Sequence, residues 1–162
     1  MPFRKIEDAL TTCQELLATI SAQRPENPHA AEIESYLVSS MVMLIVSEYE
    51  DLIEQLFIER SLLCKDGYIC NYVKSSVAQK FRSPDLGKIT DFLGKFGSDY
   101  KDGFSKSILN SEFHSAWDNI MKARHAVVHK KGSLNMTFRE LKDAYPKTKH
   151  VIIKIRGILG LQ

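Results

Sequence analysis

The stretch PHAAEIESYLVSSMVMLIVSEYEDLIEQLFIERSLL, residues 28–63, decides the fold. Its apolar residues recur every three or four positions, which is the period of a helix that buries one face. After Pro28, no glycine or proline interrupts this pattern. We therefore predict one helix of roughly 34 residues, about 50 Å long at 1.5 Å per residue. A helix of this length either spans a whole small domain or reaches a partner.

Polar residues, prolines and glycines mark the ends of the other predicted helices. A first amphipathic helix is predicted over roughly residues 3–21, because the prolines that follow cannot continue it. Asn27 is the expected N-cap of the long helix, with Pro28 in its first turn. The later boundaries are Ser83-Pro84-Asp85 before a short helix, Ser111 before a longer one that Gly132 ends, and the Thr137–Glu140 capping box before a last helix toward Ile158. Residues 97–103, rich in Gly, Asp and Lys, are predicted to form a loop.

Together these elements predict an all-α fold, an antiparallel helical bundle with one long second helix, in a single domain over residues 1–162. The chain has only 8 glycines and 5 prolines, and no turn dipeptide joins two alternating stretches. The alternating stretch VIIKIRGI, residues 151–158, would need a second strand to pair with, and none is predicted. We therefore interpret it as part of the last helix.

Composition argues against several classes of protein. With 22 basic and 20 acidic residues the net charge is only +2, so any nucleic-acid site must be local. The longest uncharged run, residues 35–47, is shorter than the ~20 apolar residues of a membrane span. The 3 cysteines lack CxxC spacing, which argues against a disulfide scaffold and a zinc knuckle. The first residues contain no apolar signal core. We expect a cytoplasmic protein with reduced thiols and no membrane partner.

The stretch KARHAVVHKKG, residues 122–132, gathers an arginine, two histidines and three lysines around three small apolar residues. His125 and His129 stand at i and i+4, the spacing of a two-histidine metal pair on one helix face. However, Ala126 occupies the position where a metalloprotease motif has glutamate, and a third ligand would have to come from elsewhere, such as His114, His150 or a carboxylate. We therefore expect no metal and no other cofactor.

The same stretch also suits an anion. Arginine binds phosphate through two parallel donors, and histidine exchanges a proton near neutral pH. Arg124 and His129 are five residues apart, so on a regular helix they lie about 140° apart. They converge on one ligand only if the helix frays or turns near Val128 and His129, which Gly132 favours because glycine relieves the chain where a helix ends. A structural alternative stays open, because cations near a helix C-terminus are favoured by the macrodipole by about 0.3–1 kcal/mol each.

Arg124 and His129 resemble the R-x4-6-H motif of HEPN domains (higher eukaryotes and prokaryotes nucleotide-binding), in which a polar residue such as His125 follows the arginine. The long second helix with Tyr49-Glu50 near its middle and the capped final helix agree with the layout of that family. The resemblance covers essentially the whole chain. It is closest to the single-domain proteins of the RiboL-PSP type.

The resemblance implies an all-α homodimer and a metal-independent endoribonuclease of toxin or antiviral defence systems, in which two copies of the motif form one composite cleft. Carried over to this sequence, Arg124 and His129 are the catalytic pair and His125 is the second position of the motif. Glu50 and Asp118 match acidic positions less closely. The implied partners are an RNA substrate, a second copy of the chain, and an antitoxin or defence-system protein.

RNA supplies its own nucleophile, the 2′-hydroxyl, so this chemistry needs no metal-bound water. A histidine accepts the hydroxyl proton and an arginine stabilises the charged phosphorane. Lys122, Lys130 and Lys131 are the expected contacts to flanking phosphates.

Two other interpretations remain open at this stage. One is a non-catalytic HEPN module that binds nucleotide or RNA, or scaffolds a protein partner. The other is an ordinary helical interaction protein in which the motif arises by chance. Trp117 is expected to lie in the core rather than to stack on bases, since it follows the helical period of apolar residues. Tyr49 is expected to pack in the dimer or in the bundle rather than to stack on a base.

Overall fold

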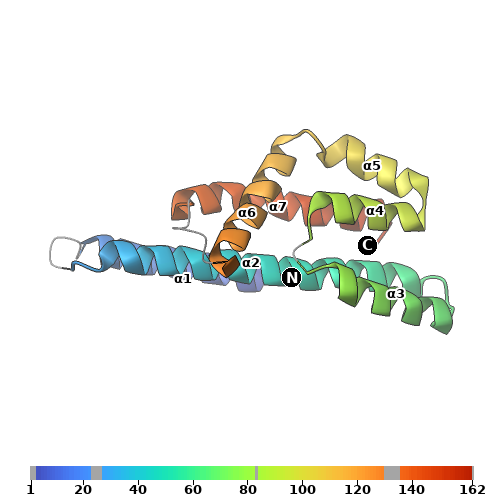
Figure 1. Ribbon diagram of the computed structural model, residues 1–162, viewed down its shortest axis with the longest axis horizontal. Helices are drawn as coiled ribbons and strands as arrows, with labels where there is room; N and C mark the ends of the chain where they lie inside the picture. Colours follow the sequence, from blue (N-terminus) through green and yellow to red (C-terminus); the bar gives the residue numbers. More distant parts are fainter. Residues whose placement is uncertain (1–2, 23–26, 83, 130–135, 162) are drawn as a thin grey trace.

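The computed structural model describes residues 3–22, 27–82, 84–129 and 136–161, which form seven α-helices and contain no strand (Figure 1). The predicted all-α class is confirmed. The helices are α1 (Arg4–Ala22), α2 (Ala30–Leu62), α3 (Gly67–Lys80), α4 (Leu86–Phe96), α5 (Ser98–Ile108), α6 (Glu112–His129) and α7 (Phe138–Ile158).

The long helix α2 organises the molecule, as its unbroken apolar pattern predicts. It has 33 residues. In Figure 1, α1 lies along its first half and α3 along its second half, while α6 and α7 pack on it from the side. Ion pairs tie the neighbours together at the surface, among them Lys5 with Glu48 and Arg156 with Glu59. By length and composition alone α2 could also cross a membrane, but here it packs against α1, α3, α6 and α7 and, through Phe57, against α4.

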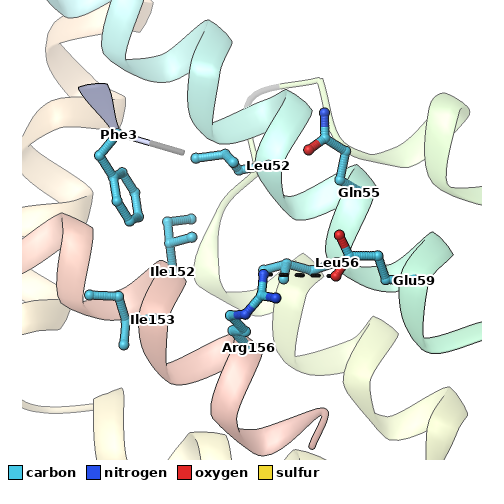
Figure 2. Close-up of a pocket in the computed structure, with 8 residues that line it drawn as sticks. All are labelled: Phe3, Leu52, Gln55, Leu56, Glu59, Ile152, Ile153 and Arg156. Carbon is cyan, nitrogen blue, oxygen red and sulfur yellow. Dashed lines mark ion pairs between the residues drawn. The ribbon is translucent and has the colours of Figure 1, made fainter. Parts of the chain in front are cut away.

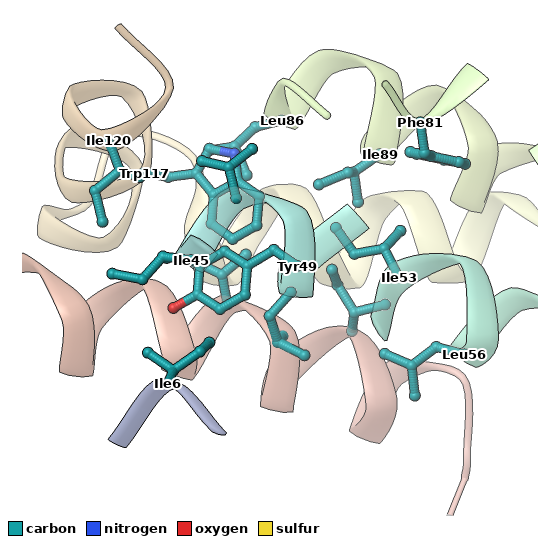
Figure 3. Packing of buried hydrophobic residues seen from close by; sticks show 14 of the residues in the cluster. Ile6, Ile45, Tyr49, Ile53, Leu56, Phe81, Leu86, Ile89, Trp117 and Ile120 are labelled. Carbon is teal, nitrogen blue, oxygen red and sulfur yellow. The ribbon is translucent and has the colours of Figure 1, made fainter. Parts of the chain in front are cut away.

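The centre of the core is a pair of stacked rings, Tyr49 of α2 and Trp117 of α6 (Figure 3). Both side chains are completely buried, so Trp117 lies in the core as predicted and Tyr49 packs within the bundle. The Trp117 Nε1–H donates to the carbonyl of Pro84, 2.9 Å away. The Tyr49 hydroxyl lies 2.8 Å from Oγ1 of Thr148 on α7. These polar contacts satisfy the two amphipathic rings; the first joins α6 to the segment before α4, and the second joins α2 to α7.

The predicted caps are largely confirmed. Asp85 accepts from the Lys88 N–H at the start of α4. Ser111 Oγ accepts from two backbone N–H groups in the first turn of α6. Thr137 and Glu140 form the reciprocal capping box of α7, and that helix runs through residues 151–158 as predicted. Ser83 and Gly132 lie outside the described residues.

Two boundary predictions are wrong. Asn27 does not cap α2, whose N-cap is His29. The Asn27 side chain instead accepts from the His29 N–H, 3.0 Å away, and stabilises the turn before the helix. The predicted loop 97–103 lies largely within α5, which begins directly after Gly97. That glycine adopts φ +154°, a backbone conformation that favours glycine, so the chain reverses there and not over a long loop.

Candidate functional site

The motif of residues 124–129 occupies the last two turns of α6. Four side chains along one face of this helix are buried, and they attach it to the rest of the bundle: Ala116, Trp117, Ile120 and Ala123. Helical periodicity turns the side chains on the other face of α6 toward solvent. The apolar period of α6 thus presents the motif at the surface.

A stripe of polar and titratable side chains follows this outer face of α6. It contains His114, Asp118, Lys122, His125 and His129, which follow one another at intervals of three or four residues. The rings of His125 and His129 lie with their centroids 4.2 Å apart and their planes at 49°. Both histidines are exposed. The stripe therefore brings the two predicted histidines together, as their i and i+4 spacing requires.

His114 and Asp118 lie at the N-terminal end of this stripe and form a pair that was not predicted from the sequence. The Asn110 backbone N–H donates to Nδ1 of His114 at 3.1 Å. A nitrogen that accepts carries no proton, so the neutral ring holds its proton on Nε2. That atom lies 3.6 Å from Oδ2 of Asp118. The signal in the sequence was their i and i+4 spacing, the same as that of His125 and His129.

A shallow, open hollow of about 480 Å³ lies beside the motif. It is lined by Asp118, Met121, Lys122, His125 and Ala126. The floor is mostly apolar, while the charged and titratable groups come from Asp118, Lys122 and His125. Such a surface can receive a flat, partly apolar group next to an anionic one.

Arg124 points to a different side of α6 from His129. The helix stays regular through His129, so the two residues lie about 140° apart around its axis. α6 ends at His129, and up to that residue no fraying or turn brings the two side chains together within one chain. Arg124 is half-buried, and its Nε is buried without a hydrogen-bond partner among the described residues. A buried donor without an acceptor costs free energy, so an acceptor from a ligand or second protein would stabilise this guanidinium.

The remaining predicted site residues are Glu50, Lys122, Lys130 and Lys131. Glu50 lies on α2, half-buried next to Tyr49. Lys122 is exposed within the stripe of α6. Lys130 and Lys131 lie outside the described residues. The structure therefore brings His125, His129 and Lys122 together on one face and places Arg124 on another.

The described residues contain no group of three histidine, cysteine, aspartate or glutamate side chains arranged to hold a metal ion. His150, one of the candidate third ligands, stacks on Phe113 with ring centroids 4.4 Å apart. His114 faces Asp118. The histidine pair thus stands without a third metal-binding neighbour in this part of the chain.

A second hollow, of about 170 Å³, lies between the start of the chain, α2 and α7 (Figure 2). Its walls are aliphatic and aromatic side chains, including Phe3, Leu56 and Ile152. The polar groups at its edge include Arg156 and Glu59, which pair with each other at 3.8 Å. Arg156 and Glu59 pair with each other and no histidine lines this hollow, so the α6 stripe is the better candidate site for proton transfer beside a phosphate.

Comparison with known proteins agrees with the helical layout. A family model described as RiboL-PSP-HEPN matches residues 5–160, nearly the whole chain. No curated protein and no solved structure matches the chain.

Proposed function

Because this chain belongs to the RiboL-PSP-type HEPN family, we propose that it is a metal-independent endoribonuclease of the toxin or defence type. Membership of the family supports a nucleotide-binding or ribonuclease domain. The observation that carries the finer proposal is the end of α6, where two exposed histidines, an exposed lysine and a partly buried arginine gather. A binding module has no need of a proton-transferring histidine pair at that position.

The active form is a homodimer with a composite site. Within one chain, Arg124 and His129 lie on different sides of a regular helix. A two-fold axis beside α6 removes this difficulty, because Arg124 of one copy then faces the partner's His129. The acceptor that the buried Nε of Arg124 lacks would come from the bound phosphate or from the second copy.

The surface for this second copy lies on the first half of α2. On one face there, the exposed residues from Tyr36 to Ser47 are uncharged: Tyr36, Ser40, Met43 and Ser47. Two helices can approach over these residues without burying a charge. Charged residues flank this uncharged face, since Glu32 lies one turn before Tyr36 and Asp51 one turn after Ser47.

The reaction follows from these groups. His129 accepts the proton of the 2′-hydroxyl, and the resulting oxygen attacks the adjacent phosphorus. Arg124 donates to the oxygens of the phosphorane, whose charge rises in the transition state. The bond to the 5′-oxygen breaks, and a protonated histidine returns a proton to that oxygen. The products are a 2′,3′-cyclic phosphate and a 5′-hydroxyl, and DNA is not cleaved because it lacks the nucleophile.

Substrate binding rests on local basic groups. Lys122 stands in the stripe beside His125, and Lys130 and Lys131 follow the motif directly in sequence. Each lysine that contacts a phosphate releases a counterion, so cleavage at low substrate concentration falls as salt rises. Asp118, which faces His114, is the acidic member of this otherwise cationic surface.

The proposal is tested by incubating purified protein with end-labelled single-stranded RNA in EDTA. His129→Ala is the test variant. His29→Ala is its matched control, since His29 is an exposed histidine at the start of α2. We expect cleavage by the parent and by His29→Ala, with cyclic phosphate ends, and a loss of about a hundredfold or more in His129→Ala. No cleavage of any RNA by a folded, dimeric sample would favour the non-catalytic HEPN module.

A further inference from the structure

The molecule exposes a second surface that the proposed reaction does not use. Five of the ten exposed large apolar side chains among the described residues lie within residues 62–72, where α2 ends and α3 begins. Tyr68 and Tyr72 are 91% and 71% exposed. The other three are aliphatic: Leu62, Leu63 and Ile69. Apolar groups gathered in this way on a soluble domain mark a contact surface.

A hollow of about 310 Å³ adjoins these side chains. Ile69, Tyr72 and Val73 of α3 form one wall, and Phe92 and Phe96 of α4 form the other. Its lining is mostly apolar, and it is less open than the hollow beside the motif. We call this hollow together with Leu62, Leu63 and Tyr68 the α3 surface. In Figure 1, α3 and the end of α2, which contribute to this surface, lie at one end of the molecule, apart from the end of α6.

The rim of the α3 surface is positively charged. Between Gly67 and Lys80 the helix contains no aspartate or glutamate. The Asp66 carboxylate just before it accepts from the N–H groups of Tyr68 and Ile69 and is committed to capping. Lys65 directly follows Cys64, and Lys95 lines the hollow; neither has a carboxylate partner within the part of the chain that the structure describes. The Lys95 ammonium rests 5.3 Å from the centre of the Phe92 ring.

We propose that the α3 surface docks a protein segment that inserts an apolar side chain into the hollow and places aspartates or glutamates over Lys65 and Lys95. Burial of the apolar anchor supplies the affinity, and the lysines select for acidic neighbours. This binding does not depend on ribonuclease activity, because none of the groups of the α6 stripe takes part in it.

The chemistry of the patch distinguishes this partner from two others. Single-stranded RNA binds by stacking its bases on aromatic rings, and the aliphatic side chains of Leu62, Leu63 and Ile69 offer no such ring. A second copy related by a two-fold axis would bring the same lysines against each other, with like charges opposed. An acidic, partly apolar protein segment satisfies both the aliphatic groups and the unpaired lysines.

Cys64 provides a direct reporter for occupancy. It is exposed and lines the hollow, whereas Cys13 is buried and Cys70 is half-buried with its thiol directed at the Ser61 carbonyl. A bound segment should therefore slow alkylation of Cys64 by a maleimide. The segment itself is obtained by selecting a displayed library of random peptides against the full-length protein, and the selected peptides are then synthesised.

We expect the selected peptides to carry an aromatic or aliphatic residue beside aspartate or glutamate and to protect Cys64. Tyr72→Ala should weaken them about tenfold or more, since a truncated anchor contact costs this much. Lys95→Glu, at a lysine that lines the hollow, should weaken them as well and reduce their dependence on salt. Tyr36→Ala is the matched control, an exposed tyrosine on α2 outside the surface, and should leave binding unchanged.

Other outcomes would overturn the proposal. Peptides without acidic residues, or peptides equally bound by Tyr72→Ala, would show that the surface is not the docking site. Protection of Cys64 by single-stranded RNA and not by any peptide would assign the surface to nucleic acid. A dimer that dissociates on Tyr72→Ala would assign it to a second copy. None of these results depends on whether the parent cleaves RNA.

Discussion

The rings of Tyr49 and Trp117 stack with centroids 5.2 Å apart and planes within 8° of parallel. This contact joins the middle of α2 to the helix that carries the motif, and the Tyr49 hydroxyl extends it to Thr148 on α7. The position of the candidate site therefore depends on buried residues that never touch the substrate.

Loss of the indole should destabilise the protein strongly. Trp117→Ala removes a completely buried side chain and its hydrogen bond to Pro84, at a cost of about 3–5 kcal/mol in the free energy of unfolding. Trp117→Phe keeps a ring against Tyr49 and should cost less. Urea unfolding followed by circular dichroism measures both. Equal and small losses in the two variants would contradict the central role of this stack.

Near neutral pH, removal of the Tyr49 hydroxyl should destabilise the protein less than loss of the Trp117 indole. This destabilisation should shrink in alkali. Thr148 donates to the Tyr145 carbonyl, 3.0 Å away, so it accepts from Tyr49. Tyr49→Phe loses this bond, about 1 kcal/mol. Burial, however, raises the pKa of Tyr49 well above its ordinary value.

The alkaline effect has a defined sign. A raised pKa means that the folded state keeps the phenol neutral, so its stability is complete below the unfolded pKa of about 10 and falls as the pH rises above it. Tyr49→Phe has no phenol at this position, so the variant does not lose stability through its ionisation. The difference in stability between parent and variant should therefore shrink above about pH 10. A constant difference from neutral pH into alkali would contradict this account of the buried phenol.

The capping box of α7 should give the stability an acid-dependent part. The backbone N–H and the hydroxyl of Thr137 both donate to Glu140 and lower its pKa. A lowered pKa contributes stability above the unfolded value of about 4.3, and this contribution is lost as the pH falls through the folded pKa. Glu140→Gln keeps an acceptor but no charge. Chemical unfolding from neutral to acidic pH should show the parent losing its advantage over the variant, and a pH-independent difference would be the contrary result.

A charge on the uncharged face of α2, formed by Tyr36, Ser40, Met43 and Ser47, should dissociate the proposed dimer. Met43→Glu places a carboxylate in the centre of that face, where a second copy would bury it without a partner. Ile153→Glu on α7 is the control, since Ile153 is an exposed apolar residue outside the face. Sedimentation velocity should show a monomer for Met43→Glu only. A dimer that survives in Met43→Glu would move the interface elsewhere.

The sequence predicted the helices well where local signals agree. The uninterrupted apolar period gave α2 to within two residues of its observed ends, and Ser111 and Thr137–Glu140 begin their helices through short-range side-chain bonds. Helix α5 was missed because its glycine, aspartates and lysines outweighed the i and i+4 series of Tyr100, Phe104 and Ile108. The last two of these are completely buried.

The arrangement of the candidate site was harder to predict, because it depends on tertiary packing. Spacing alone placed His125 beside His129. It did not show that Arg124 would be half-buried with an unpaired Nε, since that depends on what packs against α6. Nor did it show that Tyr68 and Tyr72 would remain exposed, because periodicity identifies the faces of a helix and not which of them finds a neighbour.

The composite site is the central claim, and pairing two inactive variants in one dimer tests it most directly. Arg124→Ala and His129→Ala are co-expressed with different tags, and the mixed dimer is purified through both. If Arg124 of one copy acts with the partner's His129, the mixed dimer contains one intact site and should recover about half of the parent's RNA cleavage, while each variant alone stays inactive. A mixed dimer as inactive as the two single variants would contradict the account. It would mean that Arg124 and His129 of each working site come from the same chain.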